Sequence, residues 1–468
     1  MFSFGTDGYR AIIADGFDFE TVGRLTQGLA AYLKQEKPKP QVLIGFDTRF
    51  LSDKFAAYSA HIAVQEGLNV EIANRFLPTP FLSYAITDKG ADAGIVITAS
   101  HNPYYYNGFK IKNAQGGSAS AEQIAAIEPY LNNNQPLAEH KFHNPLPCKT
   151  FDAKDSYFNH LGKVVPKEKL HDTGLKIVAD PLYGAGRGYF KELLESYSFE
   201  VEEIHGEDNP DFGGLHPEPI GENLKELKEK VLESGADIGL ALDGDADRSG
   251  VIDEKGNFVN SHQIFALLLY YLVEHKKRRG VVAKTYSTTS LVDIMANAYG
   301  LEVIQTPIGF KHISNLMLTK DILIGGEESG GIGIKGHIPE RDGMLIGLML
   351  TELMAETGKT INELIKVIYA KFGHFAYHRI DKIIEPSSKE NLYKHLHDYN
   401  IAKLVNKNLR QLLNQDGYKY EFEDRSWLMF RLSGTESVVR IYAEADNSEE
   451  VNRLLTCGDE LVTQLTNA

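Results

Sequence analysis

The sequence predicts an α/β protein with three consecutive α/β domains followed by a smaller α+β domain. In roughly the first three-quarters of the chain, short apolar runs alternate with helical patterns, which is typical of parallel sheets. About the last hundred residues instead alternate apolar and polar positions, as half-exposed antiparallel strands do. At 468 residues the chain is long enough for about three or four domains.

The first domain is predicted to cover residues 1–147. Apolar runs and helical periodicity predict strands at 41–46, 69–72 and 93–97 and a helix at 53–65. The stretch 132–147, which is rich in Asn, Pro and His, predicts a linker after this domain.

The same pattern then restarts twice. The second domain is predicted at 148–258, with strands at 175–179 and 238–242 and a helix at 189–196. The third domain is predicted at 259–372, with strands at 280–284, 302–305 and 322–325 and helices at 289–298 and 343–356. Asp342 is the expected N-cap of the last of these helices.

The C-terminal domain is predicted at 373–468, with half-exposed strands at 377–384 and 439–444. Ser448 followed by two glutamates is a typical start for a terminal helix, because a capping hydroxyl and acidic first-turn residues both stabilise a helix N-terminus.

Composition and the lack of targeting signals bear on the partners and the location of the protein. A net charge of −15 argues against nucleic-acid and anionic-membrane binding, so an anionic substrate must be met by a local cluster of cations. The two cysteines lie far apart, the N-terminus lacks a secretory signal, and no apolar stretch reaches the length of a membrane span. We therefore expect a cytoplasmic protein. A monomer or a small homo-oligomer is a separate expectation that these features do not determine.

Ser100 stands in the motif Thr-Ala-Ser-His-Asn-Pro at 98–103, directly after the apolar run 94–97. A serine at the end of a buried strand lies at the carboxyl edge of the sheet, where ligands of α/β proteins collect. No Gly-x-Ser-x-Gly elbow of a hydrolase is present. Lys110 could return to this serine as a phosphate ligand or proton shuttle. The alternative is a helix-capping serine beside a solvated lysine.

Asp243, Asp245 and Asp247 follow another buried strand, and Arg248 comes next. Three carboxylates at alternate positions predict a Mg²⁺ site. An EF-hand is rejected because Arg248 stands where that loop needs glycine and because a strand leads into the motif. A solvated acidic turn is the alternative, but three close carboxylates without a cation repel one another.

Two further loops are rich in small and polar residues. The first, Gly-Gly-Glu-Glu-Ser-Gly-Gly at 325–331, offers Glu327 and Ser329 to vicinal sugar hydroxyls. The adjoining Gly-x-Gly-x-x-Gly match at 331–336 does not directly end a strand, so a dinucleotide site is disfavoured. The second loop, at 431–437, contains an arginine and several hydroxyl groups that can wrap a dianion; the alternative is a polar hairpin.

Taken together and in this order, the four loops resemble those of the α-D-phosphohexomutase family, whose members include phosphoglucomutase and phosphomannomutase. The segments 4–10 and 306–311 resemble further elements of that family, so the resemblance covers essentially the whole chain. It implies three α/β domains with mixed sheets of similar topology and a smaller C-terminal α+β domain around a central cleft.

The resemblance also implies a mechanism. Ser100 would be phosphorylated, and Mg²⁺ would be held by a phosphoserine oxygen and the three aspartates. A hexose 1-phosphate and its 6-phosphate would interconvert through a bound hexose 1,6-bisphosphate. The implied catalytic residues are Ser100, Lys110, Arg10 and His101, with Lys110 preferred over Arg10 as proton carrier because arginine rarely deprotonates. The implied substrate-binding residues are Glu327, Ser329, Arg248, Lys284, Lys311, Arg431, Ser433, Gly434 and Thr435.

Departures from the family pattern bear on the substrate. Members that act on both glucose and mannose phosphates often have a histidine where this chain has Gly331, and the Glu-Glu-Ser loop resembles the glucose type. Ser437 replaces a common proline, which would loosen that turn. Glucose phosphate is therefore expected. The competing hypotheses are a hexose-1,6-bisphosphate synthase, a phosphomannomutase or phosphoglucosamine mutase, and a non-catalytic sugar-phosphate-binding protein.

Overall fold

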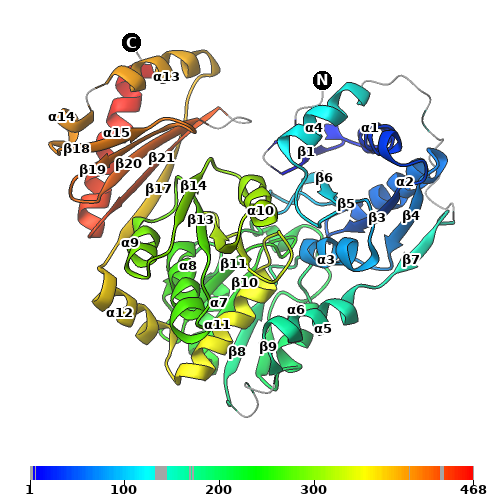
Figure 1. Cartoon of the computed structure of the whole chain (residues 1–468), viewed down its shortest axis with the longest axis horizontal. Coiled ribbons are helices and arrows are strands. Elements are labelled where there is room, and N and C mark those ends of the chain that lie inside the picture. Colours follow the sequence, from blue (N-terminus) through cyan, green and yellow to red (C-terminus); the bar gives the residue numbers. More distant parts are fainter. Residues whose placement is uncertain are drawn as a thin grey trace. The chain divides into compact units, whose positions relative to one another are not determined.

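The structure is a computed structural model that describes residues 4, 5, 7–131, 137, 145–167, 170, 173–399, 401–432 and 437–466. Figure 1 follows the chain from its N-terminus in blue to its C-terminus in red. The chain forms two compact units. One unit contains Met1–Val281 and Gly309–Ile365, and the other contains Val282–Ile308 and Lys366–Ala468.

The first α/β domain has a seven-stranded sheet with the order β2-β1-β6-β5-β3-β4-β7. Strands β3, β4 and β5 run parallel, and β6 returns antiparallel to β5. Its elements are β1 (Tyr9–Ile13), β2 (Gly16–Phe17), α1 (Phe19–Glu36), β3 (Gln41–Phe46), α2 (Ser52–Gln65), β4 (Asn69–Ala73), α3 (Thr79–Lys89), β5 (Ala93–Ile97), β6 (Tyr106–Asn113), α4 (Ala121–Ile127), η1 (Glu128–Tyr130) and β7 (Lys149–Phe151). Strand β7 lies beyond the predicted domain end at residue 147, yet it pairs with β4 in this sheet.

The second domain has a five-stranded sheet with the order β12-β11-β10-β8-β9. Strands β8, β9 and β10 are parallel, and β11 returns antiparallel to β10. Its elements are α5 (Lys154–Val164), β8 (Lys176–Asp180), α6 (Tyr189–Glu195), β9 (Glu200–Glu203), η3 (Phe212–Gly214), α7 (Lys225–Ser234), β10 (Ile238–Leu242), β11 (Ser249–Asp253) and β12 (Phe258–Val259).

The third domain repeats the same pairings: β13 pairs in parallel with β14, and β15 pairs antiparallel with β16. Its elements are α8 (Ser261–Tyr270), η4 (Tyr271–His275), β13 (Val281–Thr285), α9 (Ser290–Ala298), β14 (Val303–Thr306), α10 (Phe310–Thr319), β15 (Ile322–Gly326), β16 (Ile332–Ile334), α11 (Gly343–Thr357) and α12 (Ile361–Phe372). The predicted cap of α11 is confirmed, because the Asp342 carboxylate accepts the Leu345 N–H at 3.0 Å.

These three domains place their loops at equivalent points. In each domain the third long strand (β5, β10 or β15) is fully buried and turns back into an antiparallel partner. The three connections at that turn are the serine loop (98–105), the aspartate loop (243–248) and the Glu327 loop (327–331). The predicted fold class of consecutive α/β domains with mixed sheets is confirmed.

The C-terminal domain is an antiparallel sheet with the order β17-β21-β20-β19-β18. The long helix α15 packs against this sheet (Figure 1), and its apolar face contributes to a core with the strands. The elements are β17 (Ala376–Ile383), η5 (Pro386–Ser388), α13 (Lys389–Asp398), α14 (Ile401–Val405), β18 (Leu409–Leu413), β19 (Tyr418–Phe422), β20 (Trp427–Leu432), β21 (Val438–Ala445) and α15 (Ser448–Thr466). Among the described residues, no helix combines the length and hydrophobicity that crossing a membrane requires.

Candidate active site

Ser100 occupies a strained position at the end of β5. Its φ of 52° lies in the left-handed region, which is uncommon for a residue with a side chain. Its N–H donates to Thr98 Oγ1 at 2.9 Å, and its carbonyl oxygen accepts from Arg49 Nη2 at 2.5 Å. A Cβ atom at Gly244 would clash with that same carbonyl oxygen, so the aspartate loop needs glycine there to approach the serine loop. Contacts from Thr98, Arg49 and the aspartate loop thus keep the Ser100 backbone in this strained conformation.

The Ser100 hydroxyl lies directly on the aspartate loop. Ser100 Oγ donates to Asp243 Oδ2 at 2.8 Å, and both side chains are fully buried. The other oxygen of Asp243 accepts the N–H groups of Asp247 at 2.9 Å and Arg248 at 3.1 Å, which fixes the carboxylate in place. The loops after β5 and β10 therefore form one site.

In Asp245 and in Asp247 one carboxylate oxygen accepts hydrogen bonds and the other accepts none within the described part of the chain, although Asp247 Oδ1 lies 3.8 Å from Arg248 Nε. Asp245 Oδ2 accepts from Thr79 Oγ1 at 2.6 Å and from Lys110 Nζ at 2.7 Å. Asp247 Oδ2 accepts from Lys110 Nζ at 3.2 Å and from Arg341 Nη2 at 2.6 Å. The Oδ1 atom of each is buried and has no hydrogen-bond partner among the described residues. Buried oxygens without a partner are costly and call for a ligand.

The three aspartates fit a hard divalent cation. One oxygen of each lies within 4.8 Å of one oxygen of each of the others. Burial, and then the Asp247 and Asp245 carboxylates, raise the pKa of Asp243 well above its usual range. Carboxylate oxygens are the ligands that Mg²⁺ prefers. A cation here would reduce the repulsion among the three carboxylates and would coordinate the oxygens that accept no hydrogen bond. The residues present therefore fit the predicted metal.

Lys110 holds this cluster together from strand β6. Its ammonium is fully buried and contacts Asp7 Oδ2 at 2.8 Å as well as Asp245 and Asp247. Burial opposes the charged form, but Asp245, Asp247 and Asp7 together raise the pKa of Lys110 above its usual value. The structure therefore excludes a solvated lysine at this position.

Three other predicted site residues, Arg10, Arg248 and His101, lie beside the same cluster. Arg10 Nη1 donates to Asn102 Oδ1 at 2.8 Å, and Arg248 Nε lies 3.9 Å from Asp243 Oδ2. Burial, followed by Arg248 and Arg10, lowers the pKa of His101 well below its usual value, so this imidazole is neutral at pH 7.

Glu327 follows β15 and is buried. Its Oε1 accepts the Gly309 N–H at 3.0 Å, and its Oε2 lies 3.6 Å from Arg341 Nη1. Burial raises the pKa of Glu327, while Arg341 acts in the opposite direction. Ser329, two residues later, is half-buried. Arg341 therefore contacts both Glu327 and Asp247, which links the Glu327 loop to the aspartate loop.

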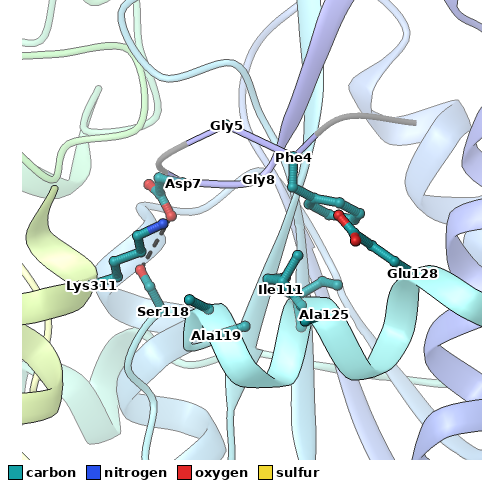
Figure 2. A pocket seen from close by; sticks show the side chains of 12 residues that line it. Phe4, Gly5, Asp7, Gly8, Ile111, Ser118, Ala119, Ala125, Glu128 and Lys311 are labelled. Atoms are coloured by element: carbon teal, nitrogen blue, oxygen red, sulfur yellow. Dashed lines mark hydrogen bonds between the residues drawn. The ribbon is translucent and has the colours of Figure 1, made fainter. Parts of the chain in front are cut away.

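Lys311 borders a cavity of about 140 Å³ in the same compact unit (Figure 2). Asp7 and Ser118 line the polar side of this cavity, and Ser118 Oγ donates to Asp7 Oδ1 at 3.2 Å. Phe4 and Ile111 are among the apolar residues that line it. The cavity thus adjoins Asp7, which in turn contacts Lys110.

The remaining predicted site residues belong to the other compact unit or lie outside the described residues. Lys284 Nζ is fully buried and donates to the Thr289 carbonyl at 2.8 Å and to Asp293, so its charge is used within its own fold. Arg431 Nε donates to Asp416 Oδ1 at 3.0 Å. Ser433, Gly434 and Thr435 lie outside the described residues.

The sequence-based prediction missed Asp7, Arg341 and the buried pair Lys112–Glu340, which belong to this cluster. Asp7 accepts from Lys110 and Arg341, and the buried pair Lys112–Glu340 lies beside it. The sequence contained one signal for the lysines. Lys110 and Lys112 are two residues apart, so in a strand their side chains lie on the same face, which indicates that they could act together. A run of charged residues at 340–342 just before an apolar helix was a second signal.

Comparisons with known proteins match the chain, domain by domain, to one family. Four family models named "Phosphoglucomutase/phosphomannomutase" match: alpha/beta/alpha domain I at 1–138, domain II at 155–256, domain III at 260–372 and the C-terminal domain at 388–456. A phosphoglucomutase/phosphomannomutase of Thermococcus kodakarensis is 30% identical over 462 residues, covering 98% of each chain. A phosphoglucosamine mutase of Caldicellulosiruptor bescii is 31% identical over 460 residues, covering 96% of each. A solved structure from Thermus thermophilus, described as a phosphomannomutase, superposes with a TM-score of 0.87 at 35% identity and 99% coverage of each chain.

Proposed function

This chain belongs to the phosphoglucomutase/phosphomannomutase family, and on that premise we propose that it interconverts hexose 1-phosphate and hexose 6-phosphate, with glucose phosphate as the main substrate. As a member it is a mutase, an intramolecular phosphotransferase. The proposed route passes through phospho-Ser100 and a bound hexose 1,6-bisphosphate. The observation that carries the proposal is the 2.8 Å contact between Ser100 Oγ and Asp243 Oδ2 in a buried carboxylate cluster.

Mg²⁺ is the proposed cofactor, with Asp243, Asp245, Asp247 and an oxygen on Ser100 as its ligands. When bound, it would neutralise charge on the phosphoryl group that is transferred. The protein itself keeps the nucleophile fixed: strain, the Thr98 hydroxyl and the Arg49 guanidinium all hold the Ser100 backbone. Burial of this cluster also keeps bulk water from the phosphoryl group, which favours transfer to a sugar over hydrolysis.

Lys110, His101 and Arg10 are the residues proposed to assist the transfer. Three carboxylates hold Lys110 in its protonated form, and the raised pKa makes its ammonium a weak acid. Its proposed part is therefore to donate a hydrogen bond to the Ser100 oxygen as negative charge develops on that oxygen. The neutral His101 has a lone pair available to accept a proton from the attacking sugar hydroxyl. Arg10 stays charged and would support the phosphoryl oxygens.

The substrate is proposed to contact two sets of groups. Glu327 and Ser329 would bind sugar hydroxyls, and Arg248 and Lys311 would add positive charge near the reacting end. The distant phosphate would be anchored by Arg431, Ser433, Gly434 and Thr435. Lys284 is a further proposed substrate contact, which requires its ammonium to leave Asp293. Binding energy from that remote phosphate would orient the reacting end of the sugar.

A comparison of hexose phosphates tests the substrate. With Mg²⁺ and a trace of glucose 1,6-bisphosphate, kcat/KM for glucose 1-phosphate is expected to exceed that for mannose 1-phosphate and glucosamine 1-phosphate by about tenfold or more, the scale of a few pocket contacts. The phosphoglucosamine mutases among the relatives make glucosamine phosphate the second candidate. Fastest turnover of glucosamine 1-phosphate would overturn the glucose assignment and leave the mutase activity standing.

The same assay separates a mutase from a bisphosphate synthase and from a binding protein. Free hexose 1,6-bisphosphate that accumulates in proportion to turnover would identify a bisphosphate synthase, because a mutase keeps this intermediate bound. Binding without turnover for every sugar would identify a non-catalytic sugar-phosphate-binding protein. The cytoplasmic location and the monomeric or small homo-oligomeric state stay predictions.

A further inference from the structure

Arg341 lies at the centre of a buried set of carboxylates. Its Nη2 contacts Asp247 Oδ2 at 2.6 Å and Asp7 Oδ2 at 2.8 Å, and its Nη1 lies 3.6 Å from Glu327 Oε2. Its Nε lies 3.4 Å from Glu340 Oε1, and the residue is only 3% exposed. These four carboxylates come from the N-terminal segment, the aspartate loop, the Glu327 loop and the segment before α11.

We propose that Arg341 is a positioning residue that fixes the Glu327 carboxylate relative to the Asp247 carboxylate, and that Gly331 is glycine in order to leave room for it. This inference rests on the proposed function, in which Glu327 binds the sugar and Asp247 the metal. Only arginine suits the position, because its planar guanidinium has five N–H donors directed to several sides. Arg341 uses Nη2, Nη1 and Nε for carboxylates that lie in different directions, and the single ammonium of a lysine would not reproduce these separate contacts.

The packing at Gly331 supports the second half of the proposal. A Cβ atom built on Gly331 would overlap Arg341 Cδ and would come within 2.8 Å of Arg341 Cγ. The glycine is thus required by space, since Gly331 is not among the glycines of positive φ. Any side chain at position 331 would push Arg341 away from its carboxylate partners.

When Arg341 is lost, Asp247 and Asp7 keep Lys110 as a cationic partner. Among the described residues, the ion pair of Glu327 is the one with Arg341, so its carboxylate loses that charge. The hydrogen bond that this carboxylate would keep is the one from the Gly309 N–H at 3.0 Å. A buried carboxylate that loses its cation is strongly disfavoured in its charged form, and the charged form is the better acceptor for sugar hydroxyls. We therefore expect weaker binding of the hexose phosphate before any change in the Ser100 chemistry.

The test is a double-mutant cycle with Gly331→Ala and Arg341→Ala. Each single variant is expected to lower kcat/KM and to raise the Kd for glucose 6-phosphate, measured by calorimetry, by about 10–100-fold, the range seen when a supporting partner of a site ligand is lost. The double variant is expected to be no worse than Arg341→Ala alone, because the shortened side chain no longer meets the new methyl group. Arg341→Lys should recover only part of the loss.

Gly162→Ala in helix α5 is the matched control, because a Cβ there meets nothing within 4 Å. Multiplicative losses in the double variant, or wild-type Kd values in Gly331→Ala, would overturn the inference. If Arg341→Ala does not fold, the Kd of Gly331→Ala alone decides, with its thermal midpoint as the check on folding. Failure of the proposed function would look different: the wild-type protein would itself show no mutase activity, whatever the variants bind.

Discussion

Ser100→Ala is expected to lower kcat for hexose phosphate interconversion by at least about a thousandfold, as removal of a covalent nucleophile does in other enzymes. Alanine keeps the small size of the side chain but removes the oxygen that would carry the phosphoryl group. The variant should still fold and bind glucose 6-phosphate, because the substitution removes the Ser100 Oγ hydrogen bond to the Asp243 carboxylate and leaves the backbone contacts of the loop in place.

Ser59→Ala is a suitable control for this variant. Ser59 is also a fully buried serine, and its hydroxyl is hydrogen-bonded to Thr26 Oγ1 at 2.8 Å within the first domain. We expect it to lower stability slightly and to leave kcat close to the wild-type value. Substantial turnover by Ser100→Ala, measured in the coupled assay with added glucose 1,6-bisphosphate, would exclude transfer through this serine.

Asp243→Asn is expected to stabilise the metal-free protein and to lower its activity strongly. Because the folded state raises the pKa of Asp243, its protonated form is preferred there, and stability falls as the pH rises above the ordinary pKa of an aspartate. Asparagine is always neutral and can still accept the Asp247 and Arg248 N–H groups. At pH 7 we expect a gain of about 1 kcal/mol, or about 2–4 °C in Tm.

The activity of the same variant should fall about a thousandfold, because several kcal/mol of charge stabilisation in the transition state depend on the cation. Added Mg²⁺ should raise the Tm of the wild-type protein and leave that of Asp243→Asn nearly unchanged. Asp208→Asn, in which the replaced side chain is 82% exposed, is the control. Equal stabilisation of Asp243→Asn by Mg²⁺, or full activity of that variant, would contradict the assignment of this cluster as the metal site.

Much of the fold could be predicted because its signals are local. The strand 41–46 is confirmed with the predicted bounds, and the strands 93–97 and 238–242 likewise. The apolar runs that predict these strands form buried central strands, and turn-forming residues end each run. The loops that follow β5 and β10 could therefore be placed at sheet edges, and the structure brings Ser100 and Asp243 together.

The parts that could not be predicted depend on long-range pairing of charges. Nothing near Lys110 in the sequence shows that its ammonium contacts Asp245, 135 residues later, in place of solvent. Arg341 contacts Asp7 across 334 residues. Such pairs form only when several loops meet in a buried place, where each charge needs a partner, so their local sequence carries little information about them.

The transfer of phosphate from Ser100 tests the proposed mechanism most directly. Enzyme that carries phosphate on Ser100 is mixed with one equivalent of glucose 1-phosphate and Mg²⁺, quenched within milliseconds to seconds, and analysed by intact mass and peptide mapping. We predict that the phosphate leaves the peptide containing Ser100 and appears in glucose 1,6-bisphosphate at least as fast as kcat. Because the second transfer returns a phosphoryl group to Ser100, the phosphate on Ser100 is isotope-labelled before mixing and should be found in the glucose 6-phosphate formed. Label that stays on Ser100 while glucose 6-phosphate forms, or a wild-type protein that never carries phosphate there, would contradict the mechanism.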